Sequence, residues 1–111
     1  ESEKAINEVR FVFNSDLNRE TTGAGKYIPE KMNTCNVHKN APALNVPKTL
    51  VKDMKIEIKN ADDKWQEIDG IKENHQRLVK IKIGKTTKAI RFTLTSTNGN
   101  EIADIYSIDL R

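Results

Sequence analysis

Cysteine, aromatic residues and long apolar runs are all scarce in this sequence. Cys35 is the only cysteine, so an internal disulfide is excluded, the core alone must hold the fold, and the redox compartment stays open. Aromatic residues make up only 5% of the chain, which argues against a stacking platform for carbohydrate or single-stranded nucleic acid. No apolar stretch approaches the roughly 20 residues of a transmembrane helix, so we expect no transmembrane segment.

Length and charge narrow the class of protein further. A chain of 111 residues has room for one domain with one two-layer core. The net charge of +3 comes from 19 Lys and Arg and 16 Asp and Glu that are interleaved along the chain, so we expect no nucleic-acid partner. The sequence begins at Glu1 without a start methionine or an apolar signal region, and we interpret residues 1–111 as a single domain excised from a larger protein.

Hydrophobic residues that alternate with polar ones dominate the regular parts of the chain. Val9, Phe11 and Phe13 alternate with polar or outward residues, and Met54, Ile56 and Ile58 alternate with charged ones. This period of two predicts β-strands with one buried face. The strands expected on this basis cover residues 8–14, 52–59, 65–68, 76–83, 89–95 and 102–110.

Turn-forming residues separate these strands and predict an all-β fold, an antiparallel β-sandwich of the jelly-roll type. Turns are expected at residues 60–63, 84–88 and 98–100, while residues 15–49 form a long irregular stretch with all three prolines. Six strands are fewer than the about eight of a jelly roll, so others either lie in the long stretch or were removed by excision. The predicted core seam comprises Val9, Phe11, Phe13, Ile56, Ile58, Ile81, Ile90, Phe92 and Ile108.

Antiparallel pairing also predicts where the loops meet, because each connection reverses the chain direction. Residues 15–49, 70–75 and 96–101 are expected at one end of the sandwich, and residues 60–64 and 84–88 at the other. The first end collects the side chains able to recognise a ligand, and loops on a rigid scaffold are where binding residues tend to lie. The candidate ligand-binding residues are Asp16, Asn18, Arg19, Tyr27, His38, Asn74, His75, Arg77, Asn98 and Asn100.

The sequence offers little support for a metal site or for catalysis. Cys35 and His38 have the spacing of half a zinc site, but a structural zinc needs four ligands, so no metal site is predicted. Nothing in the sequence places a base beside Cys35, and no phosphate-binding glycine loop is present, so no catalytic residue is predicted. Asp16 can bind a cation or a sugar hydroxyl, or it can form a turn. Trp65 can stack on a sugar ring, or it can be a core or edge-covering residue. Arg77 can bind a carboxylate or close a structural salt bridge.

Two sets of motifs resemble known families. Residues 4–13 (KAINEVRFVF) resemble the early core strand of discoidin or coagulation-factor type C domains, which have a galactose-binding-like fold. Residues 13–20 (FNSDLNRE), 46–52 (VPKTLVK), 74–80 (NHQRLVK) and 89–92 (AIRF) are similar, in the same order, to the C-terminal region of bacterial FAD-dependent oxidoreductases. In those proteins a galactose-binding-like sandwich follows the flavin domain.

The resemblance implies a noncatalytic, monomeric accessory module of a secreted or envelope-associated parent enzyme. FAD would belong to the parent, and this domain would hold no cofactor itself, with structural calcium in the long loop left open. Its partner would be the parent's catalytic domain or an extracellular glycan. The alternative is a C-terminal part of the flavoenzyme that contributes Arg19, His38 or His75 to the active-site wall.

Overall fold

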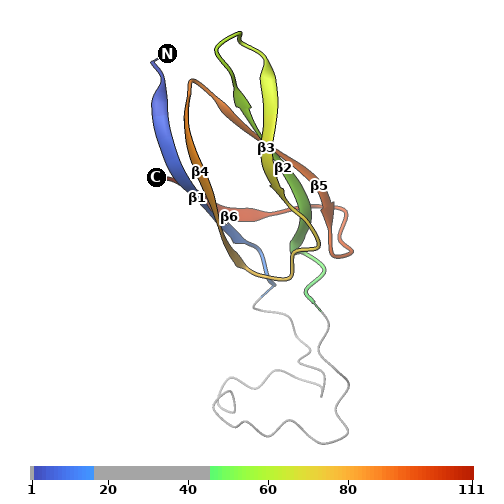
Figure 1. The fold of residues 1–111 in the computed structure, drawn as a ribbon. Helices are drawn as coiled ribbons and strands as arrows, with labels where there is room; N and C mark the ends of the chain where they lie inside the picture. The colour runs from blue at the N-terminus through green and yellow to red at the C-terminus, as the bar shows by residue number, and fades with distance from the viewer. Residues whose placement is uncertain (1, 17–45) are drawn as a thin grey trace, which may run out of the picture.

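A computed structural model describes residues 2–16 and 46–111 as two three-stranded antiparallel sheets packed as a sandwich (Figure 1). One sheet has the order β4-β1-β6 and the other the order β3-β2-β5. The all-β sandwich expected from the sequence is confirmed. No helix that could cross a membrane occurs within these two ranges. The strands are β1 (Lys4–Phe13), β2 (Val51–Lys59), β3 (Trp65–Ile71), β4 (Leu78–Thr87), β5 (Ile90–Thr97) and β6 (Ile105–Leu110).

The central strands β1 and β2 supply the core through the alternation seen in the sequence. Val9, Phe11 and Phe13 of β1 are completely buried, as is Ile56 of β2. Phe11 bridges the two layers, because its ring meets that of Phe92 on β5 edge to face with 5.0 Å between centroids. Burial of these side chains is the main force that holds the two sheets together.

The predicted turn at residues 84–88 is wrong, because β4 continues through Gly84 to Thr87. Gly84 adopts a φ of 58° at a point where the register between β1 and β4 shifts between Ile6 and Glu8. A glycine with positive φ at such a shift is a β-bulge, which bends a strand without ending it. The chain instead reverses at Lys88 and Ala89, between β4 and β5.

The expected core seam is correct at the sheet centres and wrong at one edge. Ile90 and Phe92 are half-buried, whereas Ile108 on β6 is 44% exposed. Strand β6 pairs with β1 alone, so it lies at the edge of its sheet and the opposite layer covers it poorly. The prediction also starts this strand at residue 102, but β6 begins at Ile105.

Trp65 lies on the outer surface of the edge strand β3, so the alternative that places it in the core is wrong. It is 37% exposed, and the guanidinium carbon of Arg91 lies 4.3 Å from its ring centroid. Arg91 in turn donates two hydrogen bonds to the carboxylate of Glu57, at 2.7 and 2.8 Å. The ring is therefore already occupied by a cation held in place by a bidentate ion pair.

The loops separate to the two ends of the sandwich as predicted. At one end, the backbone N–H of Asn98 donates to the Leu50 carbonyl at 2.9 Å, and that of Asn74 donates to the Lys52 carbonyl at 3.0 Å. At the other end, the Lys59 N–H donates to the Ala89 carbonyl at 3.0 Å. The connections after β1, β3 and β5 therefore meet, which fixes the position of the candidate site.

Candidate functional site

The loop end, defined here as the described residues 14–16, 46–50, 72–77 and 98–104, is tied together by two buried or half-buried asparagines. Asn74 is buried, and its Nδ2 donates to the carbonyls of Val51 and Gln76, both at 2.9 Å. Its Oδ1 accepts a hydrogen bond from the Gln76 N–H at 3.0 Å. Both amide protons and the amide oxygen of Asn74 are thus engaged within the fold, an arrangement typical of a structural residue.

Asn98 connects three segments through one side chain. Its Nδ2 donates to the carbonyls of Leu50 and Asn74, each at 3.1 Å. The residue stands in the turn between β5 and β6, where Gly99 adopts a φ of 136° as the Asn-Gly pair predicts. Asn74 and Asn98 were expected as ligand-binding residues, and the geometry instead gives both of them internal partners.

Asp53 fixes the loop after β3 against β2 and β5. The Ser96 hydroxyl donates to Asp53 Oδ2, and the Glu73 N–H donates to Oδ1 at 2.9 Å. The Ser96 hydrogen bond, followed by the one from Glu73, lowers the pKa of the Asp53 carboxyl below its ordinary value. The ionised form of Asp53 is therefore part of the structure of this end.

An exposed group of side chains, here called the Tyr106 cluster, consists of Asn14, Arg77, Asp104 and Tyr106. The Tyr106 hydroxyl donates to Asn14 Oδ1 at 3.0 Å, and Asn14 Nδ2 donates to Asp104 Oδ2 at 3.2 Å. The guanidinium carbon of Arg77 lies 5.6 Å from the Tyr106 ring centroid, within the range of a cation–π contact. Tyr106 itself is 58% exposed.

Local backbone geometry explains why Tyr106 reaches this position. The register between β1 and β6 shifts between Val12 and Phe13, which pair with Ser107 and Ile105, so Tyr106 is the extra residue of a bulge. A bulge breaks the alternation of side chains and re-aims the residue that it contains. Tyr106 therefore turns toward Asn14 and Arg77 instead of following the alternation of its strand.

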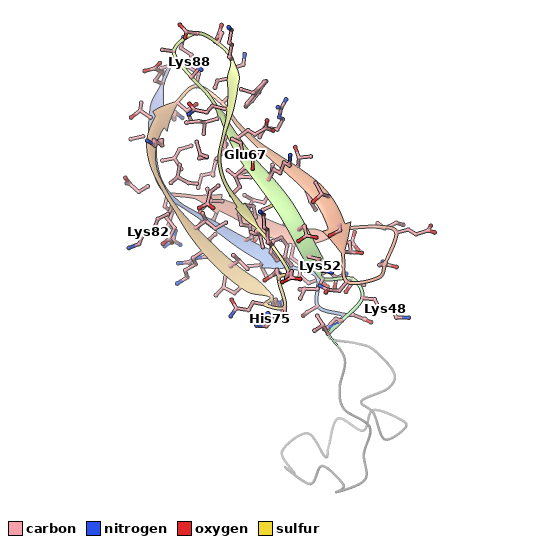
Figure 2. All side chains as sticks on the ribbon, turned by 45° about the vertical axis from the view of Figure 1, so that its right-hand side comes forward. Lys48, Lys52, Glu67, His75, Lys82 and Lys88 are labelled. Carbon is pink, nitrogen blue, oxygen red and sulfur yellow. The ribbon has the colours of Figure 1, made fainter. Side chains whose placement is uncertain are left out.

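The remaining candidate residues are distributed as follows. Asp16 is exposed with a φ of 48°, and its N–H donates to Asn14 Oδ1 at 2.9 Å, which is a turn geometry. His75 and Asn100 are exposed at the loop end, and Figure 2 shows His75 and Lys48 both at this end, far from Lys88 at the opposite end. Asn18, Arg19, Tyr27 and His38 lie outside the described residues, as does Cys35.

Sequence reasoning missed Asn14, Asp104 and Tyr106 as site residues. Asn14 follows β1 directly, which is a signal that could have been used, because residues after a strand belong to the loop end. No sequence signal joins Asn14 to Tyr106, which lies 92 positions later. Their contact depends on the bulge in β6.

The arrangement supports recognition by an exposed ring and polar side chains, and offers little for catalysis. Within residues 2–16 and 46–111, no group of three or more His, Cys, Asp or Glu could hold a metal ion. Arg77 and Asn14 supply N–H donors, and the Asp104 carboxylate supplies acceptors. These groups surround an apolar ring face, so the cluster can present both hydrogen bonds and a stacking surface to a ligand.

Comparisons with known proteins bear on the fold. No protein-family model and no curated protein matches the sequence. Among solved structures, the chain is similar to the family 32 carbohydrate-binding module from Streptococcus pneumoniae EndoD, with a TM-score of 0.60 and 18% identity. The match covers 99% of this chain and 63% of that chain, so this chain spans less than two thirds of that protein's length. The similarity supports the β-sandwich fold expected from the sequence, whereas the resemblance to FAD-dependent oxidoreductases stays a prediction.

Proposed function

We propose that this chain is a noncatalytic accessory module that binds a glycan at the loop end through the Tyr106 cluster. The observation that carries the proposal is the exposed Tyr106 ring, 58% accessible and flanked by Arg77 and Asn14. The similarity of the fold to a family 32 carbohydrate-binding module supports the same function.

The chemistry of the cluster fits a sugar. One surface of a pyranose ring carries C–H groups, which pack on an aromatic face, while its hydroxyls both donate and accept hydrogen bonds. Tyr106 supplies the apolar face, Arg77 supplies a fork of N–H donors, and Asp104 supplies carboxylate oxygens. The Trp65 ring is a weaker candidate, because it is 37% exposed against 58% for Tyr106, and Arg91 lies nearer to its centroid (4.3 Å) than Arg77 lies to that of Tyr106 (5.6 Å).

The parent protein is part of the proposal. The motifs at residues 13–20, 46–52, 74–80 and 89–92 point to an FAD-dependent oxidoreductase, with FAD bound by the parent and not by this module. The module would hold the parent's catalytic domain close to an extracytoplasmic glycan. In this setting its partners are the glycan and the catalytic domain.

A glycan array probed with the 111-residue chain tests the proposal. We expect binding to a defined set of glycans, and Tyr106→Ala to weaken it about tenfold through loss of the stacking surface. Tyr106→Phe keeps the ring and should retain most of the affinity, while Arg77→Gln should weaken binding with little effect on stability. Absence of binding to every glycan, or equal binding by wild type and Tyr106→Ala, would contradict the proposal.

The alternative, in which the chain forms part of the active-site wall of the flavoenzyme, is favoured by one observation. His75 is exposed at the loop end with no hydrogen bond to any described residue, so it is free to meet another domain there. In that case His75→Gln would reduce turnover of the parent enzyme, and the isolated chain would bind no glycan on the array.

A further inference from the structure

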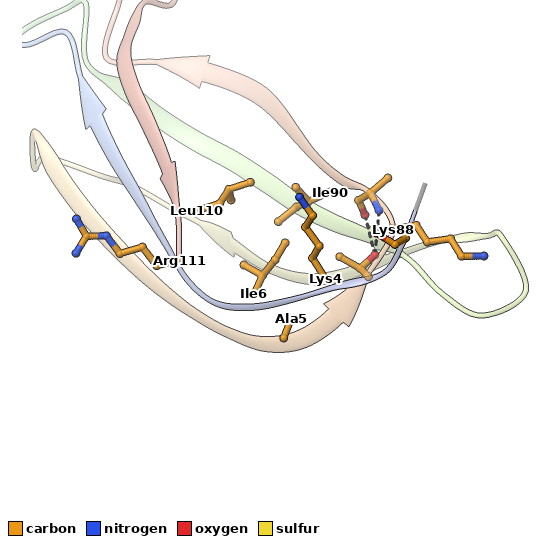
Figure 3. A pocket seen from close by; sticks show the side chains of 10 residues that line it. Lys4, Ala5, Ile6, Lys88, Ile90, Leu110 and Arg111 are labelled. Atoms are coloured by element: carbon orange, nitrogen blue, oxygen red, sulfur yellow. Dashed lines mark hydrogen bonds between the residues drawn. The ribbon is translucent and has the colours of Figure 1, made fainter.

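A second concave site lies between the two sheets at the end opposite the loop end. The cavity has a volume of about 650 Å³, which falls in the range of pockets that hold small molecules. Its apolar lining includes Ile6, Ile90 and Leu110, and its charged lining consists of Lys4, Lys88 and Arg111 (Figure 3). None of the side chains of the Tyr106 cluster contributes to it.

The cavity lies where β1 continues past its pairing with β6. Leu110, the last residue of β6, pairs with Val9, while β1 extends in the same direction to Lys4 and pairs there only with β4. Leu110 and Arg111 both line the cavity at this point. Leu110 is consequently 47% exposed, although it pairs with the fully buried Val9.

The charges at the cavity are all of one sign. Its lining contains three cationic side chains and no Asp or Glu. Arg111 already pairs with Asp109 at 2.7 Å, whereas Lys4 and Lys88 form no ion pair with any residue that the structure describes. Figure 3 shows Lys4 and Ile90 among the side chains that line the cavity.

From this combination we infer that the cavity binds an amphiphilic anion, namely an elongated apolar molecule that ends in a carboxylate. The apolar part would cover Ile6, Ile90 and Leu110, because removal of these side chains from water is favourable. The carboxylate would lie between Lys4 and Lys88, two cations that have no ion-pair partner among the described residues and that attract an anion. This site is independent of the proposed glycan site, since the two lie at opposite ends of the sandwich.

The test uses three ligands with the same ten-carbon chain: decanoate, decanol and decyltrimethylammonium. Each is titrated, below its micelle concentration, into the isotope-labelled 111-residue chain while backbone amide chemical shifts are followed by NMR. We expect saturable shifts at residues 4–6, 87–90 and 110–111, with decanoate the tightest ligand and decyltrimethylammonium the weakest. Equal affinity for all three ligands, or shifts centred elsewhere, would overturn the inference.

Matched variants separate the apolar and ionic parts of the site. Leu110→Asn should weaken decanoate binding about tenfold through loss of apolar contact, whereas Leu78→Asn, at 48% exposure on β4, should leave it unchanged. Lys88→Gln should weaken it about two- to fivefold, and Lys85→Gln, outside the lining, should not. Thermal unfolding of each variant checks that the fold is intact. If each control variant weakens binding as much as its partner, the assignment of the site is wrong.

Discussion

Replacing Asn74 by alanine is expected to destabilise the sandwich strongly, because this side chain makes three hydrogen bonds inside the loop end. Two run from Nδ2 to the carbonyls of Val51 and Gln76, and the third runs from the Gln76 N–H to Oδ1. A hydrogen bond contributes about 1 kcal/mol net, so their combined loss amounts to about 3 kcal/mol. That is a large part of the roughly 5 to 15 kcal/mol by which small domains are stable.

The measurement is urea unfolding of wild type and variants, followed by Trp65 fluorescence and by far-ultraviolet circular dichroism. The control is Asn100→Ala, since Asn100 is exposed and its side chain makes one hydrogen bond, to the Ile102 carbonyl at 3.1 Å. We expect it to cost less than about 1 kcal/mol, because water can replace that partner. The slope of the unfolding transition should be unchanged in both variants.

Asn74→Asp is a second test of the structural role of the Asn74 side chain. An ionised aspartate has no donor, so its oxygens would face the carbonyl oxygens of Val51 and Gln76 that now accept from Nδ2. The loss should therefore be at least that of Asn74→Ala at neutral pH and should shrink as the carboxyl is protonated. If Asn74→Ala costs no more than Asn100→Ala, the structural role of this residue is refuted and a ligand-binding role becomes the better explanation.

Two further predictions concern the backbone of β3 and the carboxyl of Asp53. A Cβ at Gly70 would lie 2.7 Å from the Met54 carbonyl oxygen, so Gly70→Ala should lower the stability of the fold by about 2 kcal/mol or more. A Cβ at Gly84 would meet nothing within 4 Å, so Gly84→Ala should lower the stability by only about 1 kcal/mol, the cost of its positive φ. The midpoints of urea unfolding compare the two variants. The pKa of Asp53 is lowered in the fold from 3.8, so its ionised form stabilises the protein above that pH and this stabilisation is lost as pH falls below it. The stability difference between wild type and Asp53→Asn, measured by urea unfolding at several pH values, should hence narrow below about pH 4.

The sequence predicted the strands well because period-two alternation reflects burial directly. In β2, Met54, Ile56 and Ile58 are all buried as the pattern indicates. The arrangement of loops at the two ends also followed, since it depends only on reversal of the chain at each connection. The pattern failed where a bulge interrupts it, at Gly84 in β4 and at Tyr106 in β6, because a bulge changes the alternation without changing composition.

The candidate site was harder to predict than the fold. Sequence reasoning predicted a site at the loop end, but it could not distinguish polar side chains that hold the loops from those that face solvent. Asn74 and Asn98 belong to the first kind and His75 and Arg77 to the second, and nothing in residue type separates them. The distinction depends on long-range contacts such as that between Asn98 and Leu50, 48 positions apart.

The carboxamide of Asn98, which donates to Leu50 and to Asn74 at once, has a consequence for motion at this end. A connection held only by its own strands can fray independently, but here displacement of Asn98 would leave the carbonyls of both Leu50 and Asn74 without this donor. Local unfolding at this end must therefore involve all three segments together, so their amide protons should share one slow rate of exchange with solvent.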